Sequence, residues 1–294
     1  MKRTRMLVAA ALATALALAG CGQEGAPGAQ GSGFEPTVAE NVTVEGSPTF
    51  DAMQQRGRVV IGVRDDQPGL GFQDATTGDF SGFDIDIARM VAGGLGFSPD
   101  QIDYRVVPSA AREDVIERGE IDYMVGTYTI NDNRKQRVGF AGPYYVAGQS
   151  LLVRADDTEI TGPDTLQGKI VCSVTGSTPI QRVRDEGLTD RIVEFQTYSQ
   201  CVDQLNNNQV DAVTTDDAIL LGFASQNPEQ LKVVGETFSD EPYGIGLPRD
   251  DEAFRNKVND LLQASFDDGT WQTIYDGTLG ASGTPGTPPA LDRY

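Results

Sequence analysis

The stretch GTYTINDNR, residues 126–134, combines residue types that can hold a carboxylate. It follows the short apolar run of GEIDYMV and contains a glycine, two threonines, two asparagines and Arg134. A guanidinium group binds a carboxylate through two parallel hydrogen bonds, and nearby hydroxyl groups and open backbone amides add further donors. The sequence therefore indicates a carboxylate-binding site where this apolar run ends.

The composition restricts what else this chain could bind. It has 294 residues, 23 Lys and Arg against 43 Asp and Glu, a formal net charge of −20 and no histidine. This length is sufficient for two compact domains with apolar cores. The excess negative charge repels nucleic acid, so we expect no nucleic-acid partner. Because histidine is absent and the three cysteines lie far apart, we expect no metal and no cofactor.

The N-terminus has the features of an export signal. A basic segment, MKRTR, precedes the apolar MLVAAALATALAL, which is too short for a stable membrane-spanning helix. The following LAGC resembles a bacterial lipobox, which implies a signal peptide at residues 1–20 and a lipidated, palmitate-carrying Cys21. An ordinary signal peptide followed by an unrelated cysteine is the alternative. Either way, the rest of the chain is expected outside the cytoplasm, and the lipobox implies anchoring to the outer face of the cell membrane.

Two further cysteines, Cys172 and Cys201, are left as an even pair in an oxidising compartment. We predict a disulfide between them, although two buried free thiols are the alternative because spacing does not prove pairing.

Both ends of the chain differ in composition from its centre. Residues 21–48 begin with the expected lipidated cysteine and continue rich in Gly, Pro, Ala and Ser, which predicts a flexible tether. Residues 279–294 contain few core-forming residues, which predicts a disordered tail. The folded body is therefore expected between these two segments.

The central part alternates short β-branched runs with helical patterns, which predicts α/β architecture with parallel sheets. The runs RVVIGV, DYRVV, KIVCSV and VDAVTT are typical strand candidates. In GFDIDIARMVAGGLG the apolar residues recur at helical spacing and form one stripe, made by Phe83, Ile87, Met90, Val91 and Leu95.

Several motifs in one order carry a resemblance to a known family. With GFDIDIARMVA, GEIDYMVGTYTINDNRKQRVGFAGPYY and QVDAVTTDDAIL, roughly residues 51–278 resemble the polar amino-acid binding proteins of ABC importers, family 3 of the extracytoplasmic solute-binding proteins. The resemblance implies a two-lobe, type II periplasmic-binding-protein-like fold, with two hinge crossings and a ligand cleft between the lobes.

The same resemblance implies where the lobes begin and end. The first lobe is expected to comprise residues 51–146 and 244–278, and the second lobe residues 147–243. The chain is expected to cross between them at GPYYVAGQS and SDEPYGIG.

The resemblance assigns binding roles in the first lobe. Thr127, Thr129 and Arg134 match the family positions that hold the α-carboxylate and amino groups of an amino acid. Taken alone, NDNRKQR favours a solvated charged turn. Because GFAGPYY follows it at the spacing of the family motif, the binding role of Arg134 is favoured instead.

In the second lobe, TGSTP offers Ser177 and Thr178 ahead of a helix, a composition suited to an anion at the helix N-terminus. Thr178 matches the family residue that touches the α-carboxylate, and a plain helix cap is a compatible role. Asp216 matches the acidic residue that pairs with the ligand ammonium. Asp217 is the neighbouring candidate, and simple N-capping is the alternative.

Two further arginines indicate the ligand's side chain. Arg64 and Arg112 match a pair that grips the side-chain carboxylate in the glutamate and aspartate binders of the family. The alternative is that they pair with the acidic residues at 65–66 or 113–114. Family members often place a stacking aromatic near the first loop, whereas this chain has DDQPGLGF, so its selection by side-chain size stays open.

The expected function is capture of an acidic amino acid, glutamate or aspartate, by a monomeric lipoprotein that delivers it to the permease subunits of an ABC transporter. A binder of glutamine, asparagine or another polar amino acid is the alternative. A dehydratase of the same fold and a sensor module are less favoured, because each cleft residue already has a binding role and a dehydratase needs a free acid or base.

Overall fold

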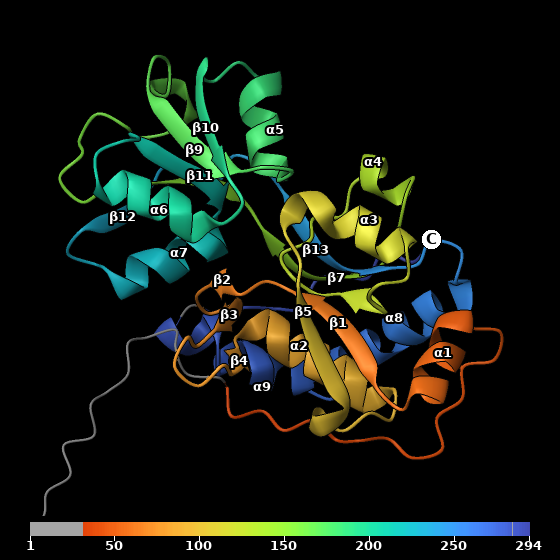
Figure 1. Ribbon diagram of the computed structural model, residues 1–294. Coiled ribbons are helices and arrows are strands. Elements are labelled where there is room, and N and C mark those ends of the chain that lie inside the picture. Colours follow the sequence, from red (N-terminus) through yellow and green to blue (C-terminus); the bar gives the residue numbers. More distant parts are fainter. Residues whose placement is uncertain (1–31, 284) are drawn as a thin grey trace, which may run out of the picture.

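The computed structural model describes residues 32–283 and 285–294. The predicted signal peptide and Cys21 lie outside these residues. Within the described part of the chain, no helix combines the length and the apolar character that crossing a membrane requires. Figure 1 shows two lobes, each with a sheet and flanking helices, so the predicted two-lobe α/β fold is confirmed.

The first lobe is built around a five-stranded sheet of β1 (Val59–Val63), β5 (Ile102–Val106), β6 (Tyr123–Met124), β7 (Gly139–Ala147) and β13 (Glu241–Leu247). The strand order is β5-β1-β6-β13-β7. Strands β1, β5 and β6 run parallel, whereas β13 pairs antiparallel with β6 and β7. Because helices cover both faces, β1 is an almost continuous apolar run, VVIGV.

The helices of this lobe are α1 (Pro48–Arg56), α2 (Phe83–Gly94), α3 (Arg112–Glu117), α4 (Asp132–Lys135), α8 (Glu252–Asp267) and α9 (Thr270–Asp276). A small antiparallel sheet contains β2 (Asp66–Gln67), β3 (Gly71–Gln73) and β4 (Phe80–Ser81). The predicted apolar stripe of α2 faces the core: its members are buried except Met90, which is partly buried. Phe83 packs edge-on against Trp271 of α9 with ring centroids 5.9 Å apart.

The second lobe has a sheet of β8 (Gln149–Arg154), β9 (Ile170–Val174), β10 (Arg191–Phe195), β11 (Ala212–Asp216) and β12 (Leu231–Val234). Its strand order is β10-β9-β11-β8-β12, with β9, β10 and β11 parallel and β8 antiparallel to its neighbours. Its helices are α5 (Thr178–Asp185), α6 (Tyr198–Asn206) and α7 (Asp217–Gln226).

The chain passes between the lobes beside one pair of strands. Strand β7 leads through Gly148 into β8, and β13 returns the chain from the second lobe. These two strands pair antiparallel from Glu241 opposite Ala147 to Leu247 opposite Gly139. The two crossings therefore lie side by side, which is the arrangement a hinge requires.

The segment before α1 is held against the first lobe. The Ala39 amide donates to the Gly93 carbonyl at 2.9 Å, and the Ser32 hydroxyl donates to the Asp86 carboxylate. Ser47 then caps α1 by accepting from the Phe50 amide at 3.0 Å. These contacts correct the prediction of a flexible tether for residues 32–47, because composition alone did not reveal the partners on α2. The rest of the predicted tether lies outside the described residues.

The C-terminal segment is also ordered by contacts, in contrast to the predicted disordered tail. The Asp292 amide donates to the Gly142 carbonyl, and the Tyr294 hydroxyl accepts from the Phe140 amide, both at 2.8 Å. Both partners belong to β7, the edge strand of its sheet. A few well-placed polar and aromatic groups thus fix a segment whose Gly and Pro content predicts disorder.

Cys172 of β9 and Cys201 of α6 form a disulfide, with Cα atoms 5.6 Å apart. The predicted pairing is confirmed in the structure, and the bond ties the first turn of α6 to β9, an interior strand of the second sheet.

Candidate functional site

The predicted site residues come together where the two lobes face each other. Each follows a strand: Arg64 follows β1, Arg112 lies beyond β5, and Arg134 beyond β6, while Thr178 follows β9 and Asp216 ends β11. In open α/β sheets the carboxyl ends of parallel strands are where ligands bind, because loops and helix N-termini present free N–H groups there.

The ring of Tyr128 organises two arginines of the first lobe. The guanidinium carbons of Arg112 and Arg134 lie 4.3 and 5.0 Å from the ring centroid. The Tyr128 hydroxyl donates to the Glu113 carboxylate at 2.7 Å. Sequence reasoning passed over Tyr128, although it lies between the two threonines of the GTYTINDNR stretch, because a buried tyrosine after a strand is ordinarily a core residue.

Arg112 is almost completely buried, with 2% of its surface exposed. Its Nε donates to the Ser109 carbonyl at 3.2 Å, and its Nη1 donates to the Gly126 and Thr127 carbonyls at 3.1 and 3.2 Å. Burial, followed by repulsion from Arg134, lowers the pKa of Arg112 to about 10. No carboxylate among the described residues forms an ion pair with this guanidinium, although Glu113 and Asp84 attract it from a longer distance. Its direct contacts among those residues are carbonyl oxygens and a ring face, so a buried positive charge lacks a directly bonded counter-charge.

Arg134 lies in the short helix α4, which Asn131 caps, and its side chain reaches the other lobe. The Asn131 side chain accepts from its amide at 2.9 Å. Its Nη1 donates to the Thr129 carbonyl at 2.7 Å, its Nη2 donates to the Gly176 carbonyl of the second lobe at 3.2 Å, and its Nε lies 3.4 Å from the Glu113 carboxylate. This arginine therefore lies between the lobes and contacts both.

Thr127 adopts a left-handed backbone conformation, with φ of 44°, which is uncommon for a residue other than glycine. Its amide donates to the buried carboxylate of Asp84 at 2.8 Å, and Asp84 also accepts from the Tyr144 hydroxyl at 2.7 Å. Burial raises the pKa of Asp84 to about 6. Asp84 lies in the quoted GFDIDIARMVA motif, and its part in holding the loop was not anticipated.

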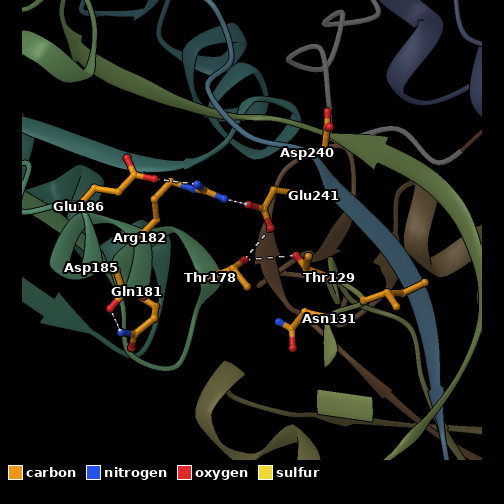
Figure 2. Close-up of a pocket in the computed structure, with 10 residues that line it drawn as sticks. Thr129, Asn131, Thr178, Gln181, Arg182, Asp185, Glu186, Asp240 and Glu241 are labelled. Atoms are coloured by element: carbon orange, nitrogen blue, oxygen red, sulfur yellow. Dashed lines mark hydrogen bonds and ion pairs between the residues drawn. The ribbon is translucent and has the colours of Figure 1, made fainter. Parts of the chain in front are cut away.

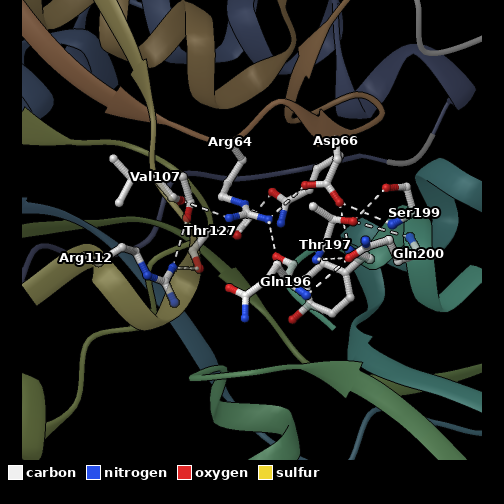
Figure 3. A network of polar contacts seen from close by, with 12 residues as sticks. Arg64, Asp66, Val107, Arg112, Thr127, Gln196, Thr197, Ser199 and Gln200 are labelled. Carbon is white, nitrogen blue, oxygen red and sulfur yellow. Dashed lines mark hydrogen bonds and ion pairs between the residues drawn. The ribbon is translucent and has the colours of Figure 1, made fainter. Parts of the chain in front are cut away.

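Arg64 is 1% exposed and makes contacts with both lobes (Figure 3). Its Nη1 donates to the Val107 carbonyl at 2.9 Å, and its Nη2 donates to the Asp66 carboxylate at 2.9 Å and to the Gln196 carbonyl of the second lobe at 3.3 Å. The alternative of an ion pair with the acidic residues at 65–66 is therefore the one realised here. Of the two arginines expected to bind the ligand's side-chain carboxylate, Arg64 is paired with Asp66, and Arg112 is the one without an ion-pair partner among the described residues.

The loop of the second lobe after β9 faces the first lobe (Figure 2). Ser177 caps α5 by accepting from the Ile180 amide at 3.3 Å. The Thr178 hydroxyl lies 3.3 Å from the Thr129 hydroxyl and donates to the Glu241 carboxylate at 2.7 Å. Sequence reasoning missed Glu241, because nothing in so acidic a chain distinguishes one buried glutamate from many exposed ones.

A pocket of about 250 Å³ opens beside the Thr129–Thr178 contact. Figure 2 shows its lining residues projecting from both lobes. They are Thr129, Ile130, Asn131, Thr178, Gln181, Arg182, Asp185, Glu186, Asp240 and Glu241. The pocket leads from solvent to the two threonines that were predicted to hold the α-carboxylate.

Asp216 presents a buried oxygen with no partner. Its Oδ2 accepts from the Tyr243 hydroxyl at 2.6 Å, while its Oδ1 is buried without a hydrogen-bond partner in the described structure. Burial, with repulsion from Glu241 as the next cause, raises the pKa of Asp216 to about 8. The neighbouring Asp217 instead accepts from the Gly148 amide at the crossing between the lobes, at 3.2 Å. Of the two candidates, Asp216 is therefore the one with a buried and unpartnered acceptor among the described residues.

The fold and these residues define a two-lobe protein with a polar site between its lobes. The family model of the bacterial extracellular solute-binding proteins, family 3, matches residues 59–281, and the chain belongs to this family.

Among characterised relatives, the chain is 40% identical to the glutamate-binding protein GluB of Corynebacterium efficiens over 85% of this chain and 90% of that protein. It is 37% identical to a glutamine-binding protein of Geobacillus stearothermophilus, over 82% of this chain and 90% of that protein. Among solved structures, an ancestral arginine-binding protein bound to arginine matches with a TM-score of 0.72 and 34% identity, over 76% of this chain and 99% of that one.

Proposed function

We propose that this protein binds an acidic amino acid, glutamate, outside the cytoplasm and delivers it to the membrane permease of an ABC importer. In this proposal the protein acts as a monomer, does not transform its ligand, and is held at the membrane by lipid on Cys21. The observation that carries the acidic ligand is the buried guanidinium of Arg112, which forms no ion pair with a carboxylate of the described residues.

The charges of the first lobe support a ligand that brings a negative charge to Arg112. Arg64 pairs with Asp66 and Arg134 lies near Glu113, whereas the direct polar and ring contacts of Arg112 within the described structure are to carbonyl oxygens and the Tyr128 ring. A buried charge is costly unless it is paired, so a side-chain carboxylate on the ligand offsets a cost that an amide offsets only in part.

Asp216 supports an ammonium group on the ligand. Its unpartnered Oδ1 is a buried acceptor, and a positive charge beside it restores the ionised form of this carboxyl group. Among the groups that carry an amino acid's charge, the ammonium group is the one that fits this oxygen.

The α-carboxylate is assigned to the group formed by Arg134, Thr129 and Thr178. Arg134 and Thr129 come from the first lobe and Thr178 from the second, and the two hydroxyls already lie 3.3 Å apart. A ligand held by this group contacts both lobes and thereby favours their approach. Ser177 and Thr127 position the two loops.

The relatives support glutamate and keep glutamine as the second candidate. Proteins named for glutamate binding are 40% and 41% identical, and proteins named for glutamine binding are 37% and 32% identical. An amide ligand would place its carbonyl oxygen at Arg112, which leaves the positive charge uncompensated.

A calorimetric titration with glutamate, glutamine and aspartate, followed by product analysis, tests the proposal directly. We expect tightest binding of glutamate, no chemical change in it, and a raised melting temperature at saturation. Tighter binding of glutamine than of glutamate, or no binding of either, would contradict it.

Two variants then test which arginine binds the side-chain carboxylate of the ligand and which binds its α-carboxylate. Arg112→Ala removes the partner of a buried side-chain carboxylate, so glutamate should lose about 2–5 kcal/mol of binding free energy, about 30-fold to several thousand-fold, with much less effect on glutamine. Arg134→Ala should weaken both ligands alike, because both carry the α-carboxylate. Arg105→Ala, which removes an exposed arginine of the same lobe, is the matched control and should change neither affinity.

A further inference from the structure

The turn after β1 in the first lobe contacts the start of α6 in the second lobe. The Oδ2 atom of Asp66 accepts hydrogen bonds from the backbone amides of Tyr198 at 2.7 Å and Ser199 at 3.2 Å. Figure 3 shows Asp66 beside the first turn of this helix, with Thr197, Ser199 and Gln200 around it. One carboxylate of the first lobe thus satisfies two amides of a helix in the other lobe.

These amides are groups that a helix cannot satisfy by itself. The first N–H groups of a helix have no partner within the helix, and its N-terminus carries a partial positive charge. The Thr197 hydroxyl accepts from the Gln200 amide at 3.4 Å and from the Ser199 hydroxyl at 3.0 Å. The backbone amides of Tyr198 and Ser199 are left to Asp66. A carboxylate is the favoured partner at this position.

Arg64 makes the contact more specific. Its Nη2 donates to the Oδ1 atom of Asp66 and also reaches the Gln196 carbonyl, one residue before the helix cap. The Asp66 side chain is 9% exposed, so both of its oxygens are withdrawn from water and hydrogen-bonded. Arg64 and Asp66 together therefore bind both a donor pair and an acceptor of the second lobe.

A second close approach lies beside the first. The Pro68 carbonyl, two residues after Asp66, faces Gly222 of α7, where an added Cβ atom would lie 2.2 Å from the carbonyl oxygen. The same turn of the first lobe therefore contacts two helices of the second lobe.

We propose that Asp66 is a closure residue, which strengthens the binding of any amino-acid ligand by joining the two lobes without touching the ligand. Its partners lie on the opposite lobe, so these hydrogen bonds exist only when the lobes are together, and the carboxylate returns to water when they separate. The contact adds to the free energy of the closed arrangement and chiefly slows its opening. This inference rests on the proposed function in requiring a ligand that closes the lobes.

The same contact gives Arg64 a structural role. While Asp66 holds its Nη2 atom, the positive charge of Arg64 is compensated within the protein. Discrimination between glutamate and glutamine is then left to Arg112, and Asp66 affects both ligands through closure.

The experiment compares Asp66→Ala and Asp66→Asn with Asp65→Ala. The control removes the same charge one residue earlier, where the carboxylate forms no hydrogen bond or ion pair with another described residue. Dissociation constants and dissociation rates for glutamate and glutamine are measured by calorimetry and stopped flow. Circular dichroism confirms folding, and the isosteric Asp66→Asn serves if the alanine variant is poorly folded.

We expect Asp66→Ala to weaken both ligands at least about tenfold, chiefly through faster dissociation, as the loss of charge-assisted hydrogen bonds implies. Asp66→Asn should lose less, because its oxygen still accepts from an amide, and Asp65→Ala should stay close to wild type. Asp66→Ala also frees the positive charge of Arg64, which can raise the affinity for glutamate relative to that for glutamine but cannot lower it.

An unchanged affinity in Asp66→Ala, a loss confined to one ligand, or an equal loss in Asp65→Ala would overturn the inference. The proposed function is tested by other measurements, so the two failures can be told apart. These are the titration of the wild-type protein and the ratio of glutamate affinity to glutamine affinity in Arg112→Ala.

Discussion

The Asp216 carboxyl group and the Tyr243 hydroxyl lie 2.6 Å apart, and the second oxygen of Asp216 is buried with no partner among the described residues. This pair joins the end of β11 to the returning strand β13, so one residue of the candidate site is fixed directly to the crossing between the lobes. The other oxygen is free to meet a ligand.

The raised pKa of Asp216, about 8, predicts a pH-dependent stability. The folded protein keeps this proton up to about pH 8, whereas the unfolded chain loses it near pH 4, so the folded state holds more protons between these values. The free energy of unfolding should therefore fall as the pH rises through this range. Asp216→Asn should remove this contribution, which urea denaturation at pH 6 and pH 8 measures. Identical pH slopes in both proteins would contradict the assignment.

Ligand binding should release a proton from the same group. An ammonium group pairs with ionised Asp216, so at pH 7 the complex should form with release of close to one proton, and affinity should fall as the pH is lowered. Calorimetry in buffers of different ionisation enthalpy counts this proton. Asp216→Asn should release none, and a wild-type protein that releases none would exclude Asp216 as the ammonium partner.

Gly222→Ala should have opposite effects on stability and on binding. Alanine is favoured over glycine inside a helix by roughly 0.5–1 kcal/mol, so the unliganded variant should be slightly more stable. Its Cβ atom would nevertheless meet the Pro68 carbonyl when the lobes approach, which should weaken every ligand. Thermal melts and titrations measure both effects, with the exposed Leu221→Ala in the same helix as the control. An unchanged affinity would mean that the lobes need not approach this closely.

Breaking the disulfide should lower stability. Cys172 and Cys201 are 29 residues apart, and closing a loop of that length stabilises by roughly 3–4 kcal/mol in the chain-entropy model. The Cys172→Ala/Cys201→Ala double variant should lose about this much free energy of unfolding in urea titrations. Mass spectrometry after alkylation of the unreduced, unfolded wild-type protein should find neither thiol labelled.

The C-terminal tyrosine should contribute measurably to stability. Tyr294 accepts from the Phe140 amide, and its ring lies 4.1 Å from the Lys135 ammonium and 4.8 Å from the Arg255 guanidinium carbon. Tyr294→Ala should lower the free energy of unfolding by about 1–2 kcal/mol, through one hydrogen bond and two partly exposed cation–π contacts. Tyr294→Phe keeps the ring and isolates the hydrogen bond. Equal stability of all three proteins would contradict this role.

The sequence was most informative where local pattern determines structure. The apolar stripe of α2 predicted a helix with one core-facing side, and the family resemblance carried by the motifs implied two lobes. The direction of parallel strands decides which end of a sheet the next loop reaches, so the ends of the strands indicated where the site lies. The choice of Arg134 and Asp216 within those loops came from the family resemblance.

Contacts between distant segments could not be predicted in the same way. The pairing of Asp66 with the α6 amides joins residues 132 positions apart, and it exists only because the lobes face each other. Glu241 and Tyr128 acquire their roles from neighbours that periodicity does not reveal. The prediction of a disordered C-terminal tail was wrong for a related reason. Asp292 and Tyr294 are hydrogen-bonded to residues of β7, and composition does not reveal such partners.

The position of the C-terminal segment also bears on solubility. Strand β7 contains the apolar sequence GFAGPYYVA and forms the outer edge of its sheet, the kind of edge to which a strand of another molecule can add. Residues 292 and 294 occupy one acceptor and one donor of that edge. The segment therefore covers part of an edge at which strands of two molecules could pair. We expect a chain shortened at residue 284 to expose that edge and to aggregate more readily in concentrated solution.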